Sequence, residues 1–482
     1  MRRLAVILSV VALIAVACSR DDSSSDSTND TGADTTDEQG GGGDEFASLE
    51  SDDFGTIPWP CGSNEGGGEV ASGGADETQG VTNDSIKVST IADPGYEAVP
   101  GLNQEMLDIA EAFVEECNDR GGVNGKELDL TLRDSALFEY TARVEEACAE
   151  DFAVVGAGAV FDDTGAQAMT DCGLVEISGF NTTAPSSLAD NVVQPVPNPP
   201  NVKPGAHLIK LLNELEDDGA GIDTDVDEIT QNSGLMWGDI QTTIDVADQY
   251  QKTAEELGFD FVYEASYNIL GESNWAPFVA AMEEAGVQFL YFVGSPDFFI
   301  ELQEAMDEFG YAPKIIFQEA NFYDEDYAEG IEGLNPDTLQ LVRTVYWPFE
   351  LADQNPATQI YLDLLDKYVP NAEVANLGEQ ALSAWLLFAT SAQECDLDND
   401  LTRSCLYDTA KAVDSWTGGG LHTETSPADF EPPPCGLILE VNGGTFELWR
   451  PEGDTPDDAF FCDEDAIIEI DGDYGEGVTR QG

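Results

Sequence analysis

The residue types that most often perform catalysis are scarce in this sequence. Its two histidines, His207 and His422, are too few for a histidine-rich metal centre or an imidazole relay. The motifs G-x-S-x-G and H-E-x-x-H are absent, and so is the phosphate-binding motif G-x-x-x-x-G-K-S/T, because Gly121–Glu127 ends in Lys-Glu. The sequence therefore argues against an enzyme, and we assign no catalytic residue and no cofactor.

Two aspartate runs have the alternation of a calcium-binding loop. They are Asp223/Asp225/Asp227 and Asp396/Asp398/Asp400, and both lack the glycine and the distal glutamate that such a loop needs. We interpret both runs as solvated loops and predict no metal site.

The overall charge is strongly negative. Of 482 residues, 96 are Asp or Glu and 18 are Lys or Arg, which gives a formal net charge of −78. Such a surface repels phosphate backbones and anionic lipid headgroups, which excludes nucleic-acid binding and docking through a basic patch. We hypothesise a halophilic host, with an ordinary acidic protein as the alternative. Unfolding at about 0.05 and 1 M NaCl tests this, because high salt screens self-repulsion, and no gain in stability would contradict it.

The first 80 residues have the order of an export signal followed by a spacer. Met1-Arg2-Arg3 is positive, the segment 4–15 is apolar but short for a membrane span, and small residues precede Cys18. This order resembles the lipobox of bacterial lipoproteins, although Ala15 stands where leucine is usual. We predict a signal peptide at 1–17 and lipidation of Cys18; the alternative is a secreted protein with a stray cysteine.

Residues 18–80 are predicted to form an acidic flexible tether and an N-terminal arm. The Ser/Thr/Asp/Gly-rich part cannot bury enough apolar surface to fold. The short Trp59-Pro60-Cys61 patch is expected to dock on the folded body.

Eight cysteines remain after Cys18, and an even number in an exported chain predicts four disulfides. No C-x-x-C pair exists, which disfavours a zinc ribbon or a thioredoxin-like redox site. Many pairings are possible, and we favour neighbours in chain order: Cys61–Cys117, Cys148–Cys172, Cys395–Cys405 and Cys435–Cys462.

Apolar runs and amphipathic patterns alternate from Ser85 onward. The first series predicts strands at 86–91, 128–132, 152–160 and 174–178, with helices at 104–119, 141–150 and 163–171. A second series predicts strands at 234–238, 260–264, 287–293, 314–317 and 338–345, helices at 206–216, 242–257, 275–285, 297–309, 356–368 and 377–394, and a hairpin at 437–448.

Strands that are apolar throughout and alternate with helices indicate parallel sheets covered on both faces. The predicted fold class is α/β, with two doubly wound parallel-sheet lobes. Ligands of such sheets bind at the carboxyl ends of the strands, where two facing lobes form a cleft.

Two stretches resemble one known family. The run 113–128, Phe-Val-Glu-Glu-Cys-Asn-Asp-Arg-Gly-Gly-Val-Asn-Gly-Lys-Glu-Leu, and the opening 80–88 are similar to the leucine/isoleucine/valine-type solute-binding proteins of ABC importers. The likeness runs from about residue 80 to 470 and implies the type I periplasmic-binding-protein fold. In that fold each lobe is built from separate segments joined by a multi-strand hinge.

The resemblance also implies domain boundaries. The expected first lobe is 81–202 plus 334–418, and the expected second lobe is 203–333 plus 419–470. The crossovers would lie near 197–205, 333–345 and 415–422, and an acidic tail would cover 471–482.

In such proteins, the first-lobe loops after the strands hold the ligand. Phe161, Asp162 and Thr164 stand where the family has a Ser/Thr-rich stretch before a helix N-terminus, which could hold a carboxylate. Asp163 could simply cap that helix. An aspartate at the ligand position would instead favour a cationic or neutral solute.

The loop 178–185 matches the family's threonine-containing ligand loop, which makes Asn181, Thr182 and Thr183 candidates. Their polar groups could instead only cap a turn. Tyr96 falls where the family often has an aromatic residue, but it could equally be a packing residue.

Across the cleft, Thr243 and Ser295 stand where an aromatic residue is common, so this wall is expected to differ from the family's. Glu319 matches an acid that pairs with a ligand ammonium, although it could be an ordinary surface glutamate. Scarce arginine near these loops argues against fork-like recognition of strongly anionic ligands.

We therefore expect a monomeric, lipid-anchored receptor on the extracytoplasmic face of the cell membrane. It would close two lobes over a small polar solute, such as an amino acid or an amide, and deliver it to ABC permease subunits. The alternatives are a ligand-sensing surface lipoprotein without a transport role and, less favoured, a surface hydrolase. A permease and an ATPase encoded nearby would favour transport, and a turnover assay would reveal a hydrolase.

Overall fold

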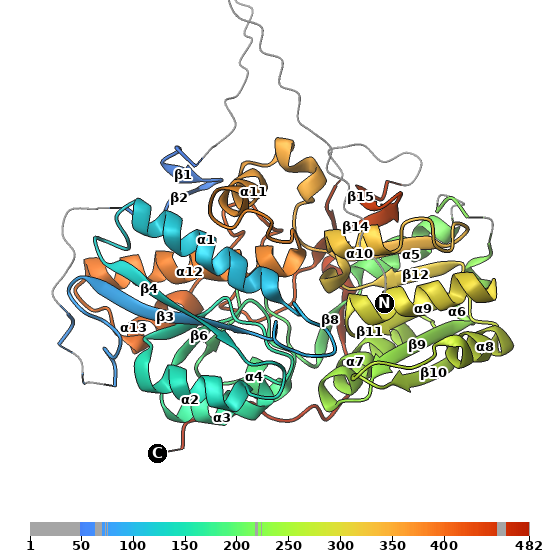
Figure 1. The fold of residues 1–482 in the computed structure, drawn as a ribbon, viewed down its shortest axis with the longest axis horizontal. Coiled ribbons are helices and arrows are strands. Elements are labelled where there is room, and N and C mark those ends of the chain that lie inside the picture. The colour runs from blue at the N-terminus through green and yellow to red at the C-terminus, as the bar shows by residue number, and fades with distance from the viewer. Residues whose placement is uncertain are drawn as a thin grey trace, which may run out of the picture. The chain divides into compact units, whose positions relative to one another are not determined.

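Two sheets of mainly parallel strands form the folded body (Figure 1). The computed structural model describes residues 49–62, 70–72, 74, 76–216, 220–222, 224–450 and 459–481. The predicted signal peptide, Cys18 and residues 19–48 of the predicted tether lie outside the described residues.

The first sheet is entirely parallel, in the order β4–β3–β5–β6–β7. Its strands are β3 (Ser85–Ala92), β4 (Glu127–Asp134), β5 (Ala153–Val155), β6 (Val175–Ile177) and β7 (Val192–Val193). The helices of this lobe are α1 (Gln104–Asp119), α2 (Tyr140–Glu150), α3 (Asp163–Asp171), α4 (Ala184–Ser187), α11 (Pro356–Tyr368), α12 (Asn376–Leu397) and α13 (Arg403–Lys411). Figure 1 shows α1 and α12 on one face of the sheet and α2 and α3 on the other.

The second sheet has the order β10–β9–β11–β12–β13–β14–β15. The strands from β10 to β13 are parallel, and the last two are antiparallel. Its strands are β9 (Ser233–Gly238), β10 (Phe261–Tyr267), β11 (Phe289–Val293), β12 (Ile315–Gln318), β13 (Leu339–Thr344), β14 (Cys435–Asn442) and β15 (Thr445–Leu448), and β16 (Phe461–Cys462) also pairs with β14. The helices of this lobe are α5 (Ala206–Glu216), α6 (Val226–Thr230), α7 (Gln241–Glu256), α8 (Ala276–Ala285), α9 (Pro296–Phe309) and α10 (Glu325–Gly330).

Smaller elements lie outside the two sheets. The antiparallel pairs are β1 (Asp53–Phe54) with β2 (Ile57–Pro58) and β8 (Val202–Pro204) with β17 (Ile467–Glu469). The 3-10 turns are η1 (Ala320–Phe322), η2 (Phe349–Gln354) and η4 (Glu464–Ala466).

The sequence explains the central strands and their flanking helices. All five residues of β11 are buried, as expected for a parallel strand covered on both faces. α9 begins where predicted, because the amide of Asp297 donates to the Ser295 hydroxyl and Pro296 occupies the first turn. The predicted α/β class with parallel-sheet lobes is confirmed.

Within the described residues, three crossovers connect the strands of one sheet with those of the other. The first crossover contains β8, the second follows β13, and the third precedes β14. The last two run beside each other, because the amide of Trp347 donates to the carbonyl of Leu421 at 2.8 Å and that of Thr423 to the carbonyl of Val345 at 3.0 Å. These backbones form the multi-strand connection that the sequence resemblance implies.

All four predicted disulfides are present: Cys61–Cys117, Cys148–Cys172, Cys395–Cys405 and Cys435–Cys462. The predicted docking of the N-terminal arm is also confirmed. Trp59 is buried against Phe113, and the Arg120 guanidinium lies 4.0 Å from the centre of its ring.

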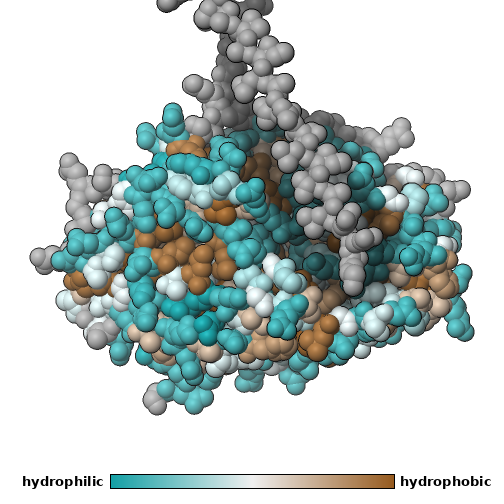
Figure 2. Space-filling model, viewed as in Figure 1, coloured by the Kyte–Doolittle hydropathy of each residue, from teal (hydrophilic) through white to brown (hydrophobic). Residues whose placement is uncertain are grey.

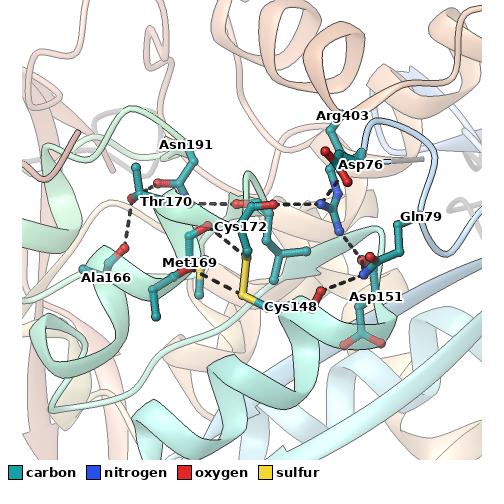
Figure 3. Close-up of a disulfide and its surroundings, with 12 residues drawn as sticks. Asp76, Gln79, Cys148, Asp151, Ala166, Met169, Thr170, Cys172, Asn191 and Arg403 are labelled. Carbon is teal, nitrogen blue, oxygen red and sulfur yellow. Dashed lines mark hydrogen bonds between the residues drawn. A yellow bond between two sulfur atoms is a disulfide. The ribbon is translucent and has the colours of Figure 1, made fainter. Parts of the chain in front are cut away.

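A buried arginine ties α13 to the rest of the first lobe (Figure 3). Arg403 donates from Nη1 to the carbonyls of Asp76 at 3.1 Å and Cys172 at 3.2 Å, and from Nη2 to that of Asp151 at 2.5 Å. Its Nε donates to the carbonyl of Phe152 at 3.1 Å. One side chain thus satisfies four carbonyls beside the Cys148–Cys172 disulfide.

Three sequence expectations are corrected. The strand expected at 152–160 ends at Val155, because Gly156 adopts a φ of +63° and a Cβ there would lie 2.9 Å from the Trp385 indole nitrogen. The first lobe was expected to resume at residue 334, but β13 pairs with β12 and belongs to the second sheet.

The third correction concerns the expected tail at 471–482. The Tyr474 hydroxyl donates to Asp248 of α7 at 2.8 Å, whereas the amide of Val478 donates to the carbonyl of Pro185 at 3.3 Å. The amide of Gln481 donates to Asp171 of α3 at 2.9 Å. The described part of this segment therefore runs from the second lobe to the first.

The face of the molecule in Figure 2 is mostly hydrophilic, with apolar side chains in smaller patches. Within the described part of the chain, no helix is both long enough and apolar enough to span a membrane.

Candidate functional site

A cavity of about 450 Å³ takes its lining from both lobes. Its walls are the loops at the carboxyl ends of β3, β5, β6, β9, β10, β11 and β12. Two hydrogen bonds join the lobes at this cavity: the Tyr96 hydroxyl donates to the carbonyl of Ile269, and the Thr242 hydroxyl donates to that of Val160 at 3.1 Å. The cavity has the size of a small-molecule site.

The ten ligand-binding candidates divide into two groups. Six line the cavity: Tyr96, Asn181, Thr182, Thr243, Ser295 and Glu319. Four do not: Phe161, Asp162, Thr164 and Thr183. Phe161 contacts Phe138, with ring centres 5.6 Å apart, and Thr164 is exposed and donates to the carbonyl of Phe161 at 2.8 Å.

Asp162 holds the neighbouring loop in place. Its carboxylate accepts hydrogen bonds from the amide of Thr182 at 2.8 Å and the hydroxyl of Thr183 at 2.6 Å. Burial raises the pKa of Asp162 to about 7, although these hydrogen bonds oppose the shift. Asp162 and Thr183 therefore contact each other and do not line the cavity. No side-chain cap is found at the start of α3, so Asp163 does not cap it either.

Asn181 is a first-lobe candidate that lines the cavity. Its amide nitrogen donates to the Ser186 hydroxyl at 2.9 Å, and its buried carbonyl oxygen has no hydrogen-bond partner among the described residues. Glu176 is buried nearby, and burial, reinforced by the charge of Asp162, raises the pKa of Glu176 to about 8.

The three Ser and Thr candidates that line the cavity already have protein partners. Thr182 donates to the carbonyl of Val160 at 3.3 Å, and Thr243 donates to that of Gly238 at 2.6 Å. Ser295 caps α9 and donates to Asp297 at 3.0 Å. These side chains shape the wall of the cavity.

Glu319 is engaged by other side chains of the protein. Its two oxygens accept from Nε of Arg343 at 2.7 Å and from Nη2 at 2.6 Å, and the Tyr291 hydroxyl donates to one of them. Glu319 lines the cavity together with its protein partners, and its pairing with a ligand ammonium stays a prediction. Arg343 itself lines the cavity, so an arginine is present despite the expected scarcity.

Three further residues of this corner were missed by the sequence analysis: Lys203, His207 and Tyr250. Lys203 donates to the side-chain oxygen of Asn198 at 2.7 Å. Burial lowers the pKa of Lys203 to about 7, with Arg343 adding to the shift and Glu319 opposing it. The sequence did contain a signal for Lys203, because a lysine is rare in this chain and this one lies in a predicted crossover between the lobes.

His207 and Tyr250 place buried polar atoms in the same corner. The Nε2 atom of His207 lies 3.3 Å from the carbonyl of Thr344, and burial lowers the pKa of His207 to about 3, so its ring is neutral. Tyr250 stacks on Tyr291, with ring centres 3.3 Å apart, and its buried hydroxyl has no hydrogen-bond partner among the described residues.

Another part of the lining is acidic. Burial raises the pKa of Glu105 to about 8, and it also raises the pKa of Asp324 and of Glu373, which lie beside each other. A pKa of about 8 leaves the Glu105 carboxyl mostly protonated near neutral pH, and burial disfavours the charged forms of Asp324 and Glu373 as well. The rest of the lining includes two more carboxylates, Asp297 and Asp326, and a set of apolar residues: Val99, Leu102, Leu137, Phe180, Leu208, Val246, Phe292, Phe298, Ile300 and Leu377.

Comparison with known proteins points to one fold. Residues 232–445 match the family described as periplasmic binding protein. The substrate-binding protein of a fatty acid ABC transporter from Thermomonospora curvata is similar with a TM-score of 0.64 at 17% identity, covering 80% of this chain and 95% of that chain. The folded body has the type I periplasmic-binding-protein fold.

Two other solved structures share this fold. A leucine binding protein from Thermotoga maritima has a TM-score of 0.59 at 15% identity, covering 77% of this chain and 99% of that chain. A solute binding protein of an ABC transporter from R. palustris, in complex with 4-hydroxybenzoate, has a TM-score of 0.59 at 15% identity, covering 78% and 98%. No curated protein sequence matches the chain. The fold that the sequence resemblance implies is confirmed.

Proposed function

We propose that this protein is the extracytoplasmic solute-binding receptor of an ABC importer. The observation that carries the proposal is the cavity, which is lined by both lobes at the carboxyl ends of their strands. A solute such as an amino acid or an amide that contacts both lobes binds the closed arrangement better than the open one, so its binding favours closure. The kinds of solute bound by the similar structures support a small-molecule ligand.

In this proposal a lipid on Cys18 holds the receptor, as a monomer, at the outer face of the membrane. Permease subunits in that membrane would accept the solute. The mostly hydrophilic face in Figure 2 suits a domain that works in water beside the membrane.

A thermal-shift panel of amino acids, amides, carboxylates, polyamines and sugars on the full chain tests the proposal. A specific solute at about 100 times its Kd should add roughly 2.7 kcal/mol to the free energy of unfolding. Mass spectrometry of the denatured protein would reveal a solute retained through purification. The absence of both a stabilising solute and a retained solute would contradict the proposal.

A further inference from the structure

A crossover and the second lobe bring two cations together in one corner of the cavity. The chain has only 18 Lys and Arg residues, yet Lys203 of β8 and Arg343 of β13 both line this cavity. Glu319 neutralises one of them through its two hydrogen bonds with Arg343, and Lys203 contacts the neutral amide of Asn198. The corner therefore has one net positive charge when Lys203 is protonated, in a molecule whose net charge is −78.

The stacked tyrosines of this corner differ in one respect. The Tyr291 hydroxyl donates to Glu319, whereas Tyr250, which lines the cavity, has a buried hydroxyl with no partner among the described residues. Tyr250 is only 8% exposed, and a buried hydroxyl without a hydrogen bond costs about 1–3 kcal/mol. A ligand oxygen that accepts from this hydroxyl would remove that cost.

We propose that this corner binds the carboxylate of the solute, which is an organic acid with an apolar body. This inference rests on the proposed function and specifies its ligand class. A carboxylate oxygen can accept from the Tyr250 hydroxyl and the Lys203 ammonium together, as charge-assisted hydrogen bonds. Its single negative charge matches the net charge of the corner, whereas a phosphate monoester carries nearly two.

The remaining lining agrees with an apolar body. Leu208 and Val246 come from α5 and α7, the helices that also carry His207 and Tyr250, and both line the cavity. The raised pKa values of Glu105 and Glu373 reduce the negative charge that an acid would meet elsewhere in the lining.

Titration calorimetry of the full chain with matched acid and amide pairs tests whether binding requires the negative charge of the carboxylate. Suitable pairs are 4-hydroxybenzoate with 4-hydroxybenzamide, octanoate with octanamide, and N-acetyl-leucine with its amide. We expect the acid of at least one pair to bind about tenfold or more tightly than its amide, which corresponds to one charge-assisted hydrogen bond. Equal or reversed affinities in every pair, or no binding by any acid, would overturn the inference.

The tyrosine pair supplies matched variants. Tyr250→Phe should weaken the bound acid about fivefold or more while leaving the melting temperature of the unliganded protein equal or higher. Tyr291→Phe is the control, since it should lower that melting temperature and keep the preference for acid over amide. Lys203→Gln should weaken the acid about tenfold and leave the amide unchanged.

The two proposals fail in different ways. If neutral amides or amines stabilise the protein while acids do not, the receptor function stands and the carboxylate site is wrong. If Tyr250→Phe and Lys203→Gln both leave the ratio of acid to amide affinity unchanged, the acid is bound elsewhere and the inference is overturned. If no solute of any class binds, both proposals fail.

Discussion

Asp162 and Glu176 are two buried carboxyl groups beside the first-lobe wall of the cavity. Asp162 accepts hydrogen bonds from Thr182 and Thr183, which fixes the loop that carries Asn181. Burial raises the pKa of Asp162 to about 7 and that of Glu176 to about 8. The groups that position this wall therefore titrate close to neutral pH.

These shifts predict a dependence of stability on pH. The folded chain retains the proton of Glu176 to a higher pH than the unfolded chain, so the free energy of unfolding should fall as the pH rises from about 5 to about 8. Glu176→Gln keeps the shape of the protonated side chain and removes this titration. We expect the variant to match the natural protein at pH 5 and to exceed its free energy of unfolding by about 2 kcal/mol or more at pH 8.

Urea titrations at the two pH values measure this difference. Glu145→Gln removes a carboxylate from the exposed side of α2 and is the control for charge alone. If both variants changed equally with pH, the titration of buried Glu176 would not be the cause.

Among the individual residues, the sequence could predict those site residues that directly follow strands. Tyr96, Asn181 and Glu319 line the cavity because each comes after the carboxyl end of a parallel strand. Lys203 and Tyr250 could not be placed in this way, because a crossover and a helix contribute them. The pairing of Glu319 with Arg343 depends on the register of two neighbouring strands, which no local pattern reveals.

Among the elements, the order of strands and helices followed from apolar runs and helical periodicity. α13 was missed, although it carries Arg403, because its short pattern lies after an acidic loop. β5 ends early because Gly156 turns beneath Trp385, a contact between segments far apart in the sequence. Local patterns thus predicted the elements, and distant contacts determined where some of them end.

Arg403 allows a prediction about how one element is attached. Arg403→Met would leave four backbone carbonyls without their charged donor. We expect the free energy of unfolding to fall by about 3 kcal/mol or more, as when a buried polar network is broken. Denaturant titration measures this loss.

Arg143→Met is the matched control, because Arg143 pairs with Glu139 and Glu146 at a partly exposed site. Its loss should cost about 1 kcal/mol or less. Similar losses in the two variants would show that the four carbonyl contacts of Arg403 add no special stability.

For the whole molecule, we propose that one solute contacts both lobes. The lobes meet through Tyr96 with Ile269 and through Thr242 with Val160 at the cavity. The segment 471–481 also runs from α7 to α3 at the surface. The C-terminal segment therefore joins the lobes at a place away from the cavity. Closure of the lobes over a solute has to be measured at the two cavity walls.

Hydrogen exchange of the full chain, with and without the solute that stabilises it most, tests this claim most directly. We expect slower exchange at both walls together, in peptides that cover 178–185 of the first lobe and 239–250 of the second. The exchange rate of a peptide that covers the exposed residues of α2 should not change. Protection of one wall alone, or of neither, would contradict a solute held between two closing lobes.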